Sequence, residues 1–115
     1  MHVCLHSCGD VRTIIPDLIE LGLDILHPIQ PTAMDRKELA REFGGHITFC
    51  GGIDVQDLLP CASPQQIREE IKDIVGTLGI FGGGLILNAA NSIMPETPFE
   101  NIEAMFETCH KYSAC

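Results

Sequence analysis

Short apolar runs alternate along the chain with longer segments in which apolar residues recur every three or four positions. A short continuous run is typical of a buried strand, whereas the longer spacing is typical of one face of an amphipathic helix. The runs predict strands at residues 2–6, 23–29, 46–49 and 85–87. A segment with helical periodicity follows each run, so the predicted order of elements is β-α-β-α-β-α-β-α.

Capping residues and glycines indicate where the predicted helices begin and end. An acidic or hydroxyl side chain precedes each helix and can accept hydrogen bonds from its first free N–H groups. The capping candidates are Asp10, Asp35 with Glu38, Ser63 with Gln66, and Thr97 before Pro98. Glycines that can stop a helix stand at Gly22, Gly44 and Gly79. The segment with Asp54 and Pro60, between the third strand and the third helix, is predicted as a loop.

Strands that alternate with amphipathic helices predict an α/β fold with parallel pairing and right-handed crossovers. We therefore expect one domain over residues 1–115, built from four consecutive βα units. Four such units can form an open doubly wound sheet. They can equally form half of an eight-stranded barrel, which usually needs about 250 residues.

The charge balance excludes several classes of partner. The chain carries 16 acidic and 7 basic residues and a net charge of −9, so it lacks the basic patches that nucleic acids and anionic membranes require. No apolar run approaches the roughly 20 residues of a membrane span. Several of the six cysteines lie in apolar runs, and the sequence shows no signal-peptide pattern. We expect a cytoplasmic protein with reduced thiols that binds neither nucleic acid nor membrane.

Polar side chains suited to chemistry follow the ends of all four predicted strands. They are His6, Cys8 and Asp10 after the first strand, His27 after the second, Cys50 and Asp54 after the third, and Asn88 and Asn91 after the fourth. Active sites of parallel α/β folds lie at this end of the strands, in open sheets and in barrels alike. We therefore expect these side chains to approach one another.

His6 and Cys8 form the sharpest of these patterns. Residues i and i+2 at a strand end point to the same side, so the imidazole and the thiolate can bind one metal ion. Zinc prefers such nitrogen and sulfur ligands, and a catalytic zinc needs three of them beside an open position. Cys50 is the candidate third ligand. The alternative is a capping loop with a small buried thiol.

The remaining candidates have structural alternatives as well. His27 is a candidate general acid or base, or else a hydrogen-bonded core imidazole. Asp54 follows two glycines whose backbone suits close approach to a ligand, so it is a second candidate catalytic residue. Asn88 and Asn91 are candidate cofactor-binding residues through their amides, although Asn is also a common turn residue.

Four stretches of the chain carry, in order, a resemblance to a known family. They are LHSCGDV, LDILHPIQPTAMD, ITFCGGID and GGLILNAANSIMPETPFENIEAM, and together they cover nearly the whole sequence. These stretches resemble the C-terminal portion of the uroporphyrinogen decarboxylase superfamily. The resemblance implies that the four βα units are the C-terminal half of a TIM-type (β/α)8 barrel.

The resemblance implies one of two chemistries. One is the lyase chemistry of porphyrin biosynthesis, in which side chains of uroporphyrinogen are decarboxylated without a metal or organic cofactor. The other is methyl transfer from a methyl-corrinoid to a thiol that zinc activates, and the motif His6-x-Cys8-Gly9 resembles this methyltransferase pattern. A zinc-bound thiolate is a good nucleophile at neutral pH. The methyltransferases place a cysteine ligand where this chain has Asn91, and the decarboxylases tend to carry His there.

Two functional hypotheses follow from these patterns. The first is part of an enzyme of this superfamily that acts with a tetrapyrrole or a corrinoid protein as its partner. The second is a non-catalytic half-barrel, because four parallel strands leave two unpaired edges and one apolar face. Such a half-barrel would form a homodimer or pair with a missing N-terminal half.

Overall fold

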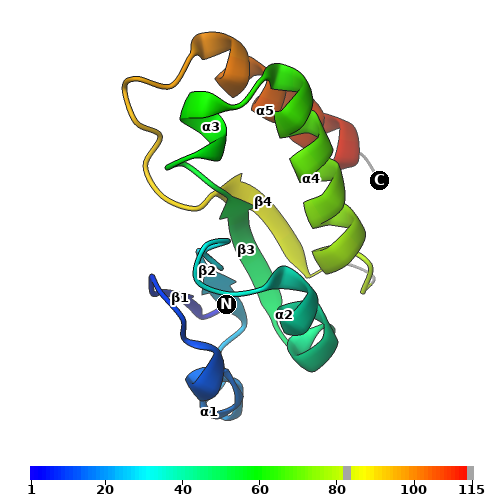
Figure 1. The fold of residues 1–115 in the computed structure, drawn as a ribbon. Coiled ribbons are helices and arrows are strands. Elements are labelled where there is room, and N and C mark those ends of the chain that lie inside the picture. Colours follow the sequence, from blue (N-terminus) through cyan, green and yellow to red (C-terminus); the bar gives the residue numbers. More distant parts are fainter. Residues whose placement is uncertain (82–83, 114–115) are drawn as a thin grey trace.

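The computed structural model describes residues 1–81 and 84–113. Its strands are β1 (Cys4–His6), β2 (Ile25–His27), β3 (Thr48–Ile53) and β4 (Leu85–Ala89). Its helices are α1 (Ile15–Glu20), α2 (Arg36–Phe43), α3 (Leu58–Cys61), α4 (Pro64–Leu78) and α5 (Phe99–Ser113), with a short 3-10 helix η1 (Arg12–Ile14) before α1. All strands pair in parallel in the order β1-β2-β3-β4 (Figure 1). The predicted α/β class and the alternation of strands and helices are confirmed.

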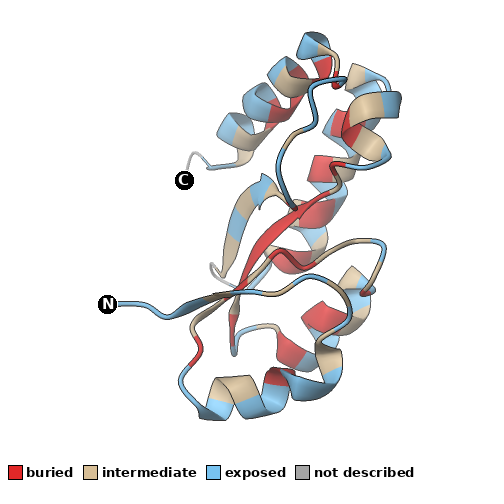
Figure 2. Cartoon of the chain, turned by 90° about the vertical axis from the view of Figure 1, so that its left-hand side faces the viewer, coloured by how far each residue is buried: buried red, intermediate tan, exposed pale blue. Residues whose placement is uncertain are grey.

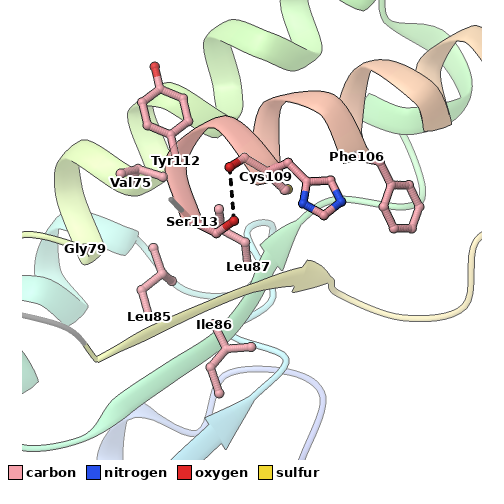
Figure 3. A pocket seen from close by; sticks show the side chains of 10 residues that line it. Val75, Gly79, Leu85, Ile86, Leu87, Phe106, Cys109, Tyr112 and Ser113 are labelled. Carbon is pink, nitrogen blue, oxygen red and sulfur yellow. Dashed lines mark hydrogen bonds between the residues drawn. The ribbon is translucent and has the colours of Figure 1, made fainter. Parts of the chain in front are cut away.

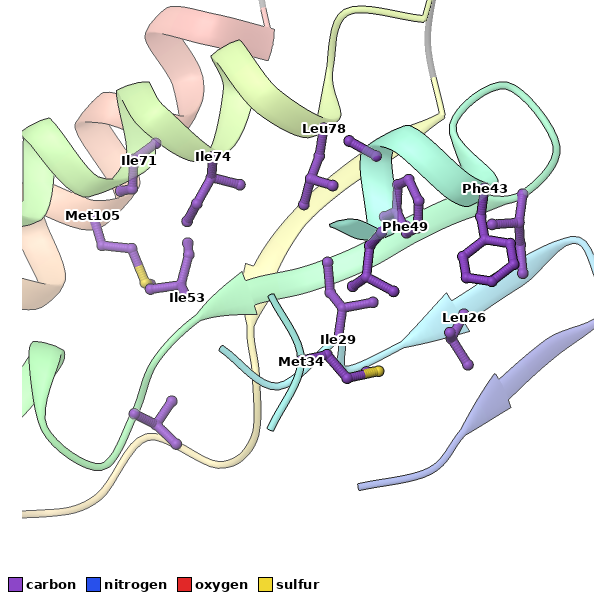
Figure 4. Close-up of a cluster of buried hydrophobic side chains, with 14 of the residues drawn as sticks. Leu26, Ile29, Met34, Phe43, Phe49, Ile53, Ile71, Ile74, Leu78 and Met105 are labelled. Atoms are coloured by element: carbon purple, nitrogen blue, oxygen red, sulfur yellow. The ribbon is translucent and has the colours of Figure 1, made fainter. Parts of the chain in front are cut away.

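One face of the sheet is covered by helices and holds the hydrophobic core. Alternate strand residues such as Leu26 and Phe49 point to this side, because successive residues of a strand face opposite ways. They meet the apolar stripes of α2 and α4, with α5 packed beside α4 (Figure 1). The core side chains labelled in Figure 4 include Leu26, Phe43, Phe49, Ile53, Ile71, Ile74, Leu78 and Met105.

The opposite face of the sheet carries the residues that alternate with the core positions. These residues are Cys4, His6, His27, Cys50, Ile86 and Asn88, and we call this surface the open face. Ile86 is 44% exposed although it lies within a strand. Figure 2 shows β3 buried along its length, whereas β4 alternates between half-buried and exposed positions. In a closed barrel the corresponding face lines the interior, so a bare face of this kind is what half a barrel leaves.

Strand β3 extends four residues beyond its predicted end at Phe49, through two glycines that we read as the start of a loop. Gly51 has φ of +110°, and a Cβ atom on it would collide with the carbonyl oxygen of Pro28. The N–H of Gly52 donates to that same oxygen at 3.1 Å. These glycines therefore let the strand run closely alongside the turn that follows β2.

Two helical segments differ from the sequence-based expectation. The predicted loop with Asp54 and Pro60 contains α3, which spans only four residues and is too short to show periodicity. The first predicted helix begins later than expected. The Asp10 side chain accepts a hydrogen bond from the N–H of Arg12 at 3.0 Å, but the chain first forms η1, and α1 begins at Ile15.

Side-chain caps were predicted correctly at two helices and wrongly at a third. The Asp35 carboxylate accepts from the N–H of Glu38 at 3.0 Å at the start of α2. At α4, Ser63 and Gln66 form both bonds of a capping box, at 3.2 and 2.8 Å. At α5, the hydroxyl of Thr97 is buried and has no hydrogen-bond partner in the described part of the chain, so it does not cap the helix.

Two further properties concern the length of the helices and the state of the cysteines. Within residues 1–81 and 84–113, the helices fall short of the length and apolarity needed to cross a membrane. The five cysteines in these ranges are free thiols, and Cys115 lies outside the described residues.

Replacement of Ser63 by Ala should lower the free energy of unfolding by about 1 kcal/mol, because the N–H of Gln66 loses its acceptor. The measurement is urea denaturation followed by circular dichroism. Ser63→Asn is the matched control, because its side-chain oxygen can take the place of the serine hydroxyl and stability should stay near wild type. Equal losses in the two variants would contradict a capping role for Ser63.

A candidate site at the carboxyl ends of the strands

The carboxyl ends of β1 and β2 bring two histidines together. His6 and His27 are direct partners in the parallel register, so their side chains project from the same face as neighbours. Their ring centroids lie 4.8 Å apart, and the two Nδ1 atoms are 2.7 Å apart. The Nε2 atom of His27 lies 3.4 Å from the carbonyl oxygen of Ala89, at the end of β4. The two imidazoles thus link the carboxyl ends of β1, β2 and β4.

The loop after β1 places Cys8 against the outer nitrogen of His6. The Sγ atom of Cys8 lies 3.5 Å from His6 Nε2, so the structure brings this predicted pair together. The loop is held in place because the N–H of Ser7 donates to the carbonyl oxygen of His27 at 2.9 Å. Two residues further along this loop, the N–H of Gly9 donates to Oε1 of Gln30 at 3.1 Å.

Asn91 reaches the same place from β4. Its Nδ2 atom lies 3.9 Å from Cys8 Sγ, and its Oδ1 atom accepts from the N–H of Ser92 at 2.8 Å. The second of these bonds orients the amide so that its donor side faces the sulfur. Asn88 lies elsewhere, within β4 on the open face, next to Cys50.

Cys50 does not join the pair formed by His6 and Cys8. Because β3 continues to Ile53, Cys50 lies in the middle of the strand and not at its end, where the sequence placed it. Its side chain is 8% exposed, and burial raises the pKa of this thiol, while a hydrogen bond with Asn88 opposes the rise. Among the described residues, no group of three His, Cys, Asp or Glu side chains is placed to share a metal ion.

The Asp54 carboxylate is occupied by backbone donors. It accepts from the N–H groups of Gln56, Asp57 and Leu58, at 3.3, 2.8 and 2.9 Å, and so holds the turn that leads into α3. Asp54 nevertheless lines a cavity of about 160 Å³ together with Cys8 and Asn91. Three of the predicted site residues therefore surround one small polar hollow at the strand ends.

Gln30 is a site residue that the sequence reasoning missed. It lines the cavity and holds the N–H of Gly9, which fixes the loop that carries Cys8. The available signal was its position, because it follows the second predicted strand at the edge where the other candidates gather.

A larger hollow lies elsewhere in the described structure. It measures about 620 Å³ and lies between β4 and α5, where Leu85, Leu87 and Phe106 line it (Figure 3). Its lining is mostly apolar, and its polar side chains, His110, Tyr112 and Ser113, all come from the end of α5 and not from the strand ends, where parallel α/β folds carry their chemistry. We therefore assign the candidate site to the smaller, polar cavity at the strand ends.

Comparison with known proteins places this arrangement in a family. Residues 1–112 match the family model described as "Uroporphyrinogen decarboxylase (URO-D)". The chain belongs to the uroporphyrinogen decarboxylase family. This result confirms the resemblance found in the sequence.

The curated relatives in the uroporphyrinogen decarboxylase family fall into two groups. A uroporphyrinogen decarboxylase of Nostoc punctiforme is 36% identical over 95 residues, which are 83% of this chain and 25% of that protein. A methylated-thiol–coenzyme M methyltransferase of Methanosarcina mazei is 27% identical over 106 residues, covering 91% of this chain and 26% of that protein. The methylcobamide:CoM methyltransferase MtaA of Methanosarcina barkeri is 28% identical over 110 residues, with coverage of 96% and 31%.

A solved structure of the same architecture supports the fold. A methyltransferase from Methanosarcina mazei superposes with a TM-score of 0.77 at 23% identity, over 98% of this chain and 32% of that chain. The chain therefore spans between a quarter and a third of the length of these relatives. Its four βα units are part of a TIM-type barrel, as the resemblance implied.

Cys50 should react more slowly with iodoacetamide than Cys61. The reaction rate of Cys50 should begin to rise at a higher pH than that of an ordinary free thiol. Burial raises the Cys50 pKa, so less thiolate is present at a given pH, whereas Cys61 is exposed. Mass spectrometry of each cysteine peptide, over a series of pH values, gives both profiles.

Asn88→Ala should move the Cys50 profile to still higher pH, because the hydrogen bond that lowers this pKa is lost. The Cys61 profile in the same variant is the internal control and should not move. A Cys50 that reacts as fast as the exposed Cys61 at every pH would overturn this view of the buried thiol.

Proposed function

We propose that this chain supplies the thiol-activating part of a methyltransferase of the uroporphyrinogen decarboxylase family. In this proposal His6 and Cys8 hold a zinc ion, and a methyl-corrinoid on a partner protein is the methyl donor. The supporting observation is the 3.5 Å separation of Cys8 Sγ and His6 Nε2. Two ligands of one tetrahedral zinc, with bonds of about 2.3 Å to sulfur and about 2.0 Å to nitrogen, lie roughly 3.5 Å apart.

The residues around this pair have separate roles in the proposal. When bound, zinc supplies the positive charge that keeps a thiol ionised at neutral pH. His6 and Cys8 supply two of the three protein ligands that a catalytic zinc needs. The third would come from a group that this structure does not place beside them, because Cys50, the third ligand predicted from the sequence, lies in the middle of β3. The Asn91 amide faces the sulfur of Cys8. Gln30 accepts a hydrogen bond from Gly9 and so fixes the loop that carries Cys8.

The chemistry of the proposed reaction is a transfer of a methyl group to sulfur. The S–C bond forms as the cobalt–carbon bond of the methyl-corrinoid breaks, and the electron pair of that bond stays on cobalt. The proton that leaves to solvent is that of the acceptor thiol, which is the substrate and not Cys8, and the exposed position of Cys8 leaves room for this at the site. The cavity lined by Cys8, Asp54 and Asn91 is where the thiol would lie.

Zinc content tests this proposal directly. The reduced wild-type chain should carry about one zinc after dialysis, measured by elemental analysis, because a nitrogen and a thiolate ligand lie at the spacing that zinc requires. His6→Ala and Cys8→Ala should each lose the metal. Cys61→Ala removes an exposed thiol on α3 and should keep it.

The other results of the zinc measurement are equally informative. Loss of zinc in Cys50→Ala would identify Cys50 as the third ligand after all, and retention would show that His6 and Cys8 hold the metal without it. A folded wild-type chain without zinc, or a Cys8→Ala variant that retains it, would exclude the proposed site. That outcome would favour the metal-free reaction considered next.

The decarboxylases among the relatives support a second candidate function, the decarboxylation of uroporphyrinogen side chains. A decarboxylase has the highest identity quoted above, 36%. For this reaction Asp54 and His27 are the candidate catalytic groups of the chain. Backbone N–H groups already occupy the Asp54 carboxylate, and His27 is engaged with His6 and Ala89. The geometry therefore supports methyl transfer better.

The bare surfaces of the half-barrel support association of the chain. In the described sheet, β1 and β4 each have one neighbour, so each leaves an unpaired edge. Ile86 is exposed on the open face, and Phe106 is 55% exposed at the apolar groove of Figure 3. In the relatives, the rest of a longer chain is available to cover such surfaces. In the isolated chain, we propose that a second copy covers them.

Ile86→Glu should shift the isolated chain from dimer to monomer in analytical ultracentrifugation, because a charge on the open face opposes burial of that face. Ile80→Glu is the control, because Ile80 is exposed outside the strands and should not affect association. A wild-type chain that sediments as a monomer at micromolar concentration would exclude the homodimer.

A further inference from the structure

We propose that His27 is a positioning residue that sets the tautomer of His6, so that the Nε2 lone pair of His6 faces Cys8. The inference rests on the zinc site proposed above for its functional meaning. The tautomer itself is a property of the chain without metal, so it can be tested separately. Two contacts link the three strands here, one from His6 Nδ1 to His27 Nδ1 and one from His27 Nε2 to the carbonyl oxygen of Ala89.

The contact between the two imidazoles demands one donor and one acceptor. His6 Nδ1 and His27 Nδ1 lie 2.7 Å apart, which is the distance of a good hydrogen bond. A neutral imidazole carries its proton on only one of its two nitrogens. Either His6 donates from Nδ1 and His27 accepts, or the reverse holds.

The carbonyl oxygen of Ala89 decides between these two arrangements. It lies 3.4 Å from His27 Nε2, and a carbonyl oxygen can only accept a hydrogen bond. His27 therefore carries its proton on Nε2 and leaves Nδ1 as the acceptor. The proton in the short contact then belongs to His6 Nδ1, and His6 Nε2 is unprotonated.

The unprotonated Nε2 atom of His6 points at the sulfur of Cys8. At 3.5 Å it can accept the S–H of the free thiol, and it presents the lone pair that a metal ligand needs. The opposite tautomer would place an N–H there and prevent coordination. A hydrogen bond to the second nitrogen of a ligating histidine is the usual means of fixing its tautomer.

The backbone around His27 holds this arrangement in place. The His27 carbonyl accepts from Ser7, and the Pro28 carbonyl accepts from Gly52, so β1 and β3 both secure the end of β2. The in-register pairing of His6 with His27 sets the spacing of the two rings. His27 thus acts on the site through His6, without contact to Cys8 in the hydrogen-bond network.

The direct test is long-range ¹H–¹⁵N NMR of the reduced, metal-free chain labelled with ¹⁵N-histidine, at a pH where the spectrum itself shows both rings to be neutral. We expect His6 to carry its proton on Nδ1 and His27 to carry its proton on Nε2. A His6 ring protonated on Nε2 would overturn the inference, whatever the zinc content of the protein.

Two variants separate positioning from a merely structural role. In His27→Leu the acceptor is lost, so the Nδ1 tautomer of His6 should no longer dominate and the zinc Kd should rise about 10- to 100-fold. His27→Asn places an amide oxygen near the position of Nδ1, so it should restore the tautomer and most of the affinity. His46→Leu, which removes an exposed histidine before β3, is the matched control.

Each outcome bears on one of the two proposals. The expected tautomers in a wild-type chain that binds no zinc would support the role of His27 and reject the proposed function. Retention of the His6 tautomer in His27→Leu would overturn the positioning role. If His27→Leu fails to fold, the wild-type spectrum decides, because it shows directly whether His6 carries its proton on Nδ1 and His27 carries its proton on Nε2.

Discussion

Parallel pairing of β1 with β2 in register is the constraint on which the candidate site depends. It places His6 directly beside His27, and it brings the loop after each strand to the same edge of the sheet. The side-chain period of a strand is two, so a slip of one residue would turn His6 into the helix-covered core and Leu5 to the open face. Leu5, which pairs with Leu26 and packs against the core, opposes such a slip because the slip would remove it from the core. The core thus fixes the register, and the register fixes the site.

The same constraint makes the sheet one-sided. Helices α2, α4 and α5 bury one face, while the open face carries His6, Cys50 and Asn88 beside the apolar Ile86. Full burial of an isoleucine side chain contributes about 1.5–3 kcal/mol, so a bare apolar position on this face is a site where covering it stabilises the structure. The chemistry and the association surface therefore share one face. Covering that face would also reduce the water around the imidazole pair and strengthen its hydrogen bonds.

The parts of the structure that follow local rules were predictable from the sequence. The alternation of strands and helices follows from local periodicity, and the capping box of Ser63 and the pairing of His6 with Cys8 join residues only two or three positions apart. The errors arose where distant backbone intervenes. Gly51 indicates a loop by local preference, but the carbonyl oxygen of Pro28 lies where a side chain would be, so glycine continues the strand there. That extension moved Cys50 away from the strand end. The contacts of His27 with Ala89 and of Gln30 with Gly9 span 62 and 21 residues and have no local signal.

Asn91 shows how the family pattern and the geometry constrain each other. It stands where the resemblance to the methyltransferases places a cysteine, and its side chain does reach Cys8, with Nδ2 at 3.9 Å from the sulfur. The chemistry of Asn91 differs from that of a cysteine, because a neutral amide is a much weaker zinc ligand than a thiolate. An amide donor beside Cys8 can instead stabilise the charge of a thiolate through a hydrogen bond. A site with one imidazole, one thiolate and this amide needs its remaining donor from elsewhere. Zinc binding at such a site depends more strongly on the correct His6 tautomer than it would with three strong protein ligands, because each strong ligand then contributes a larger share of the binding energy.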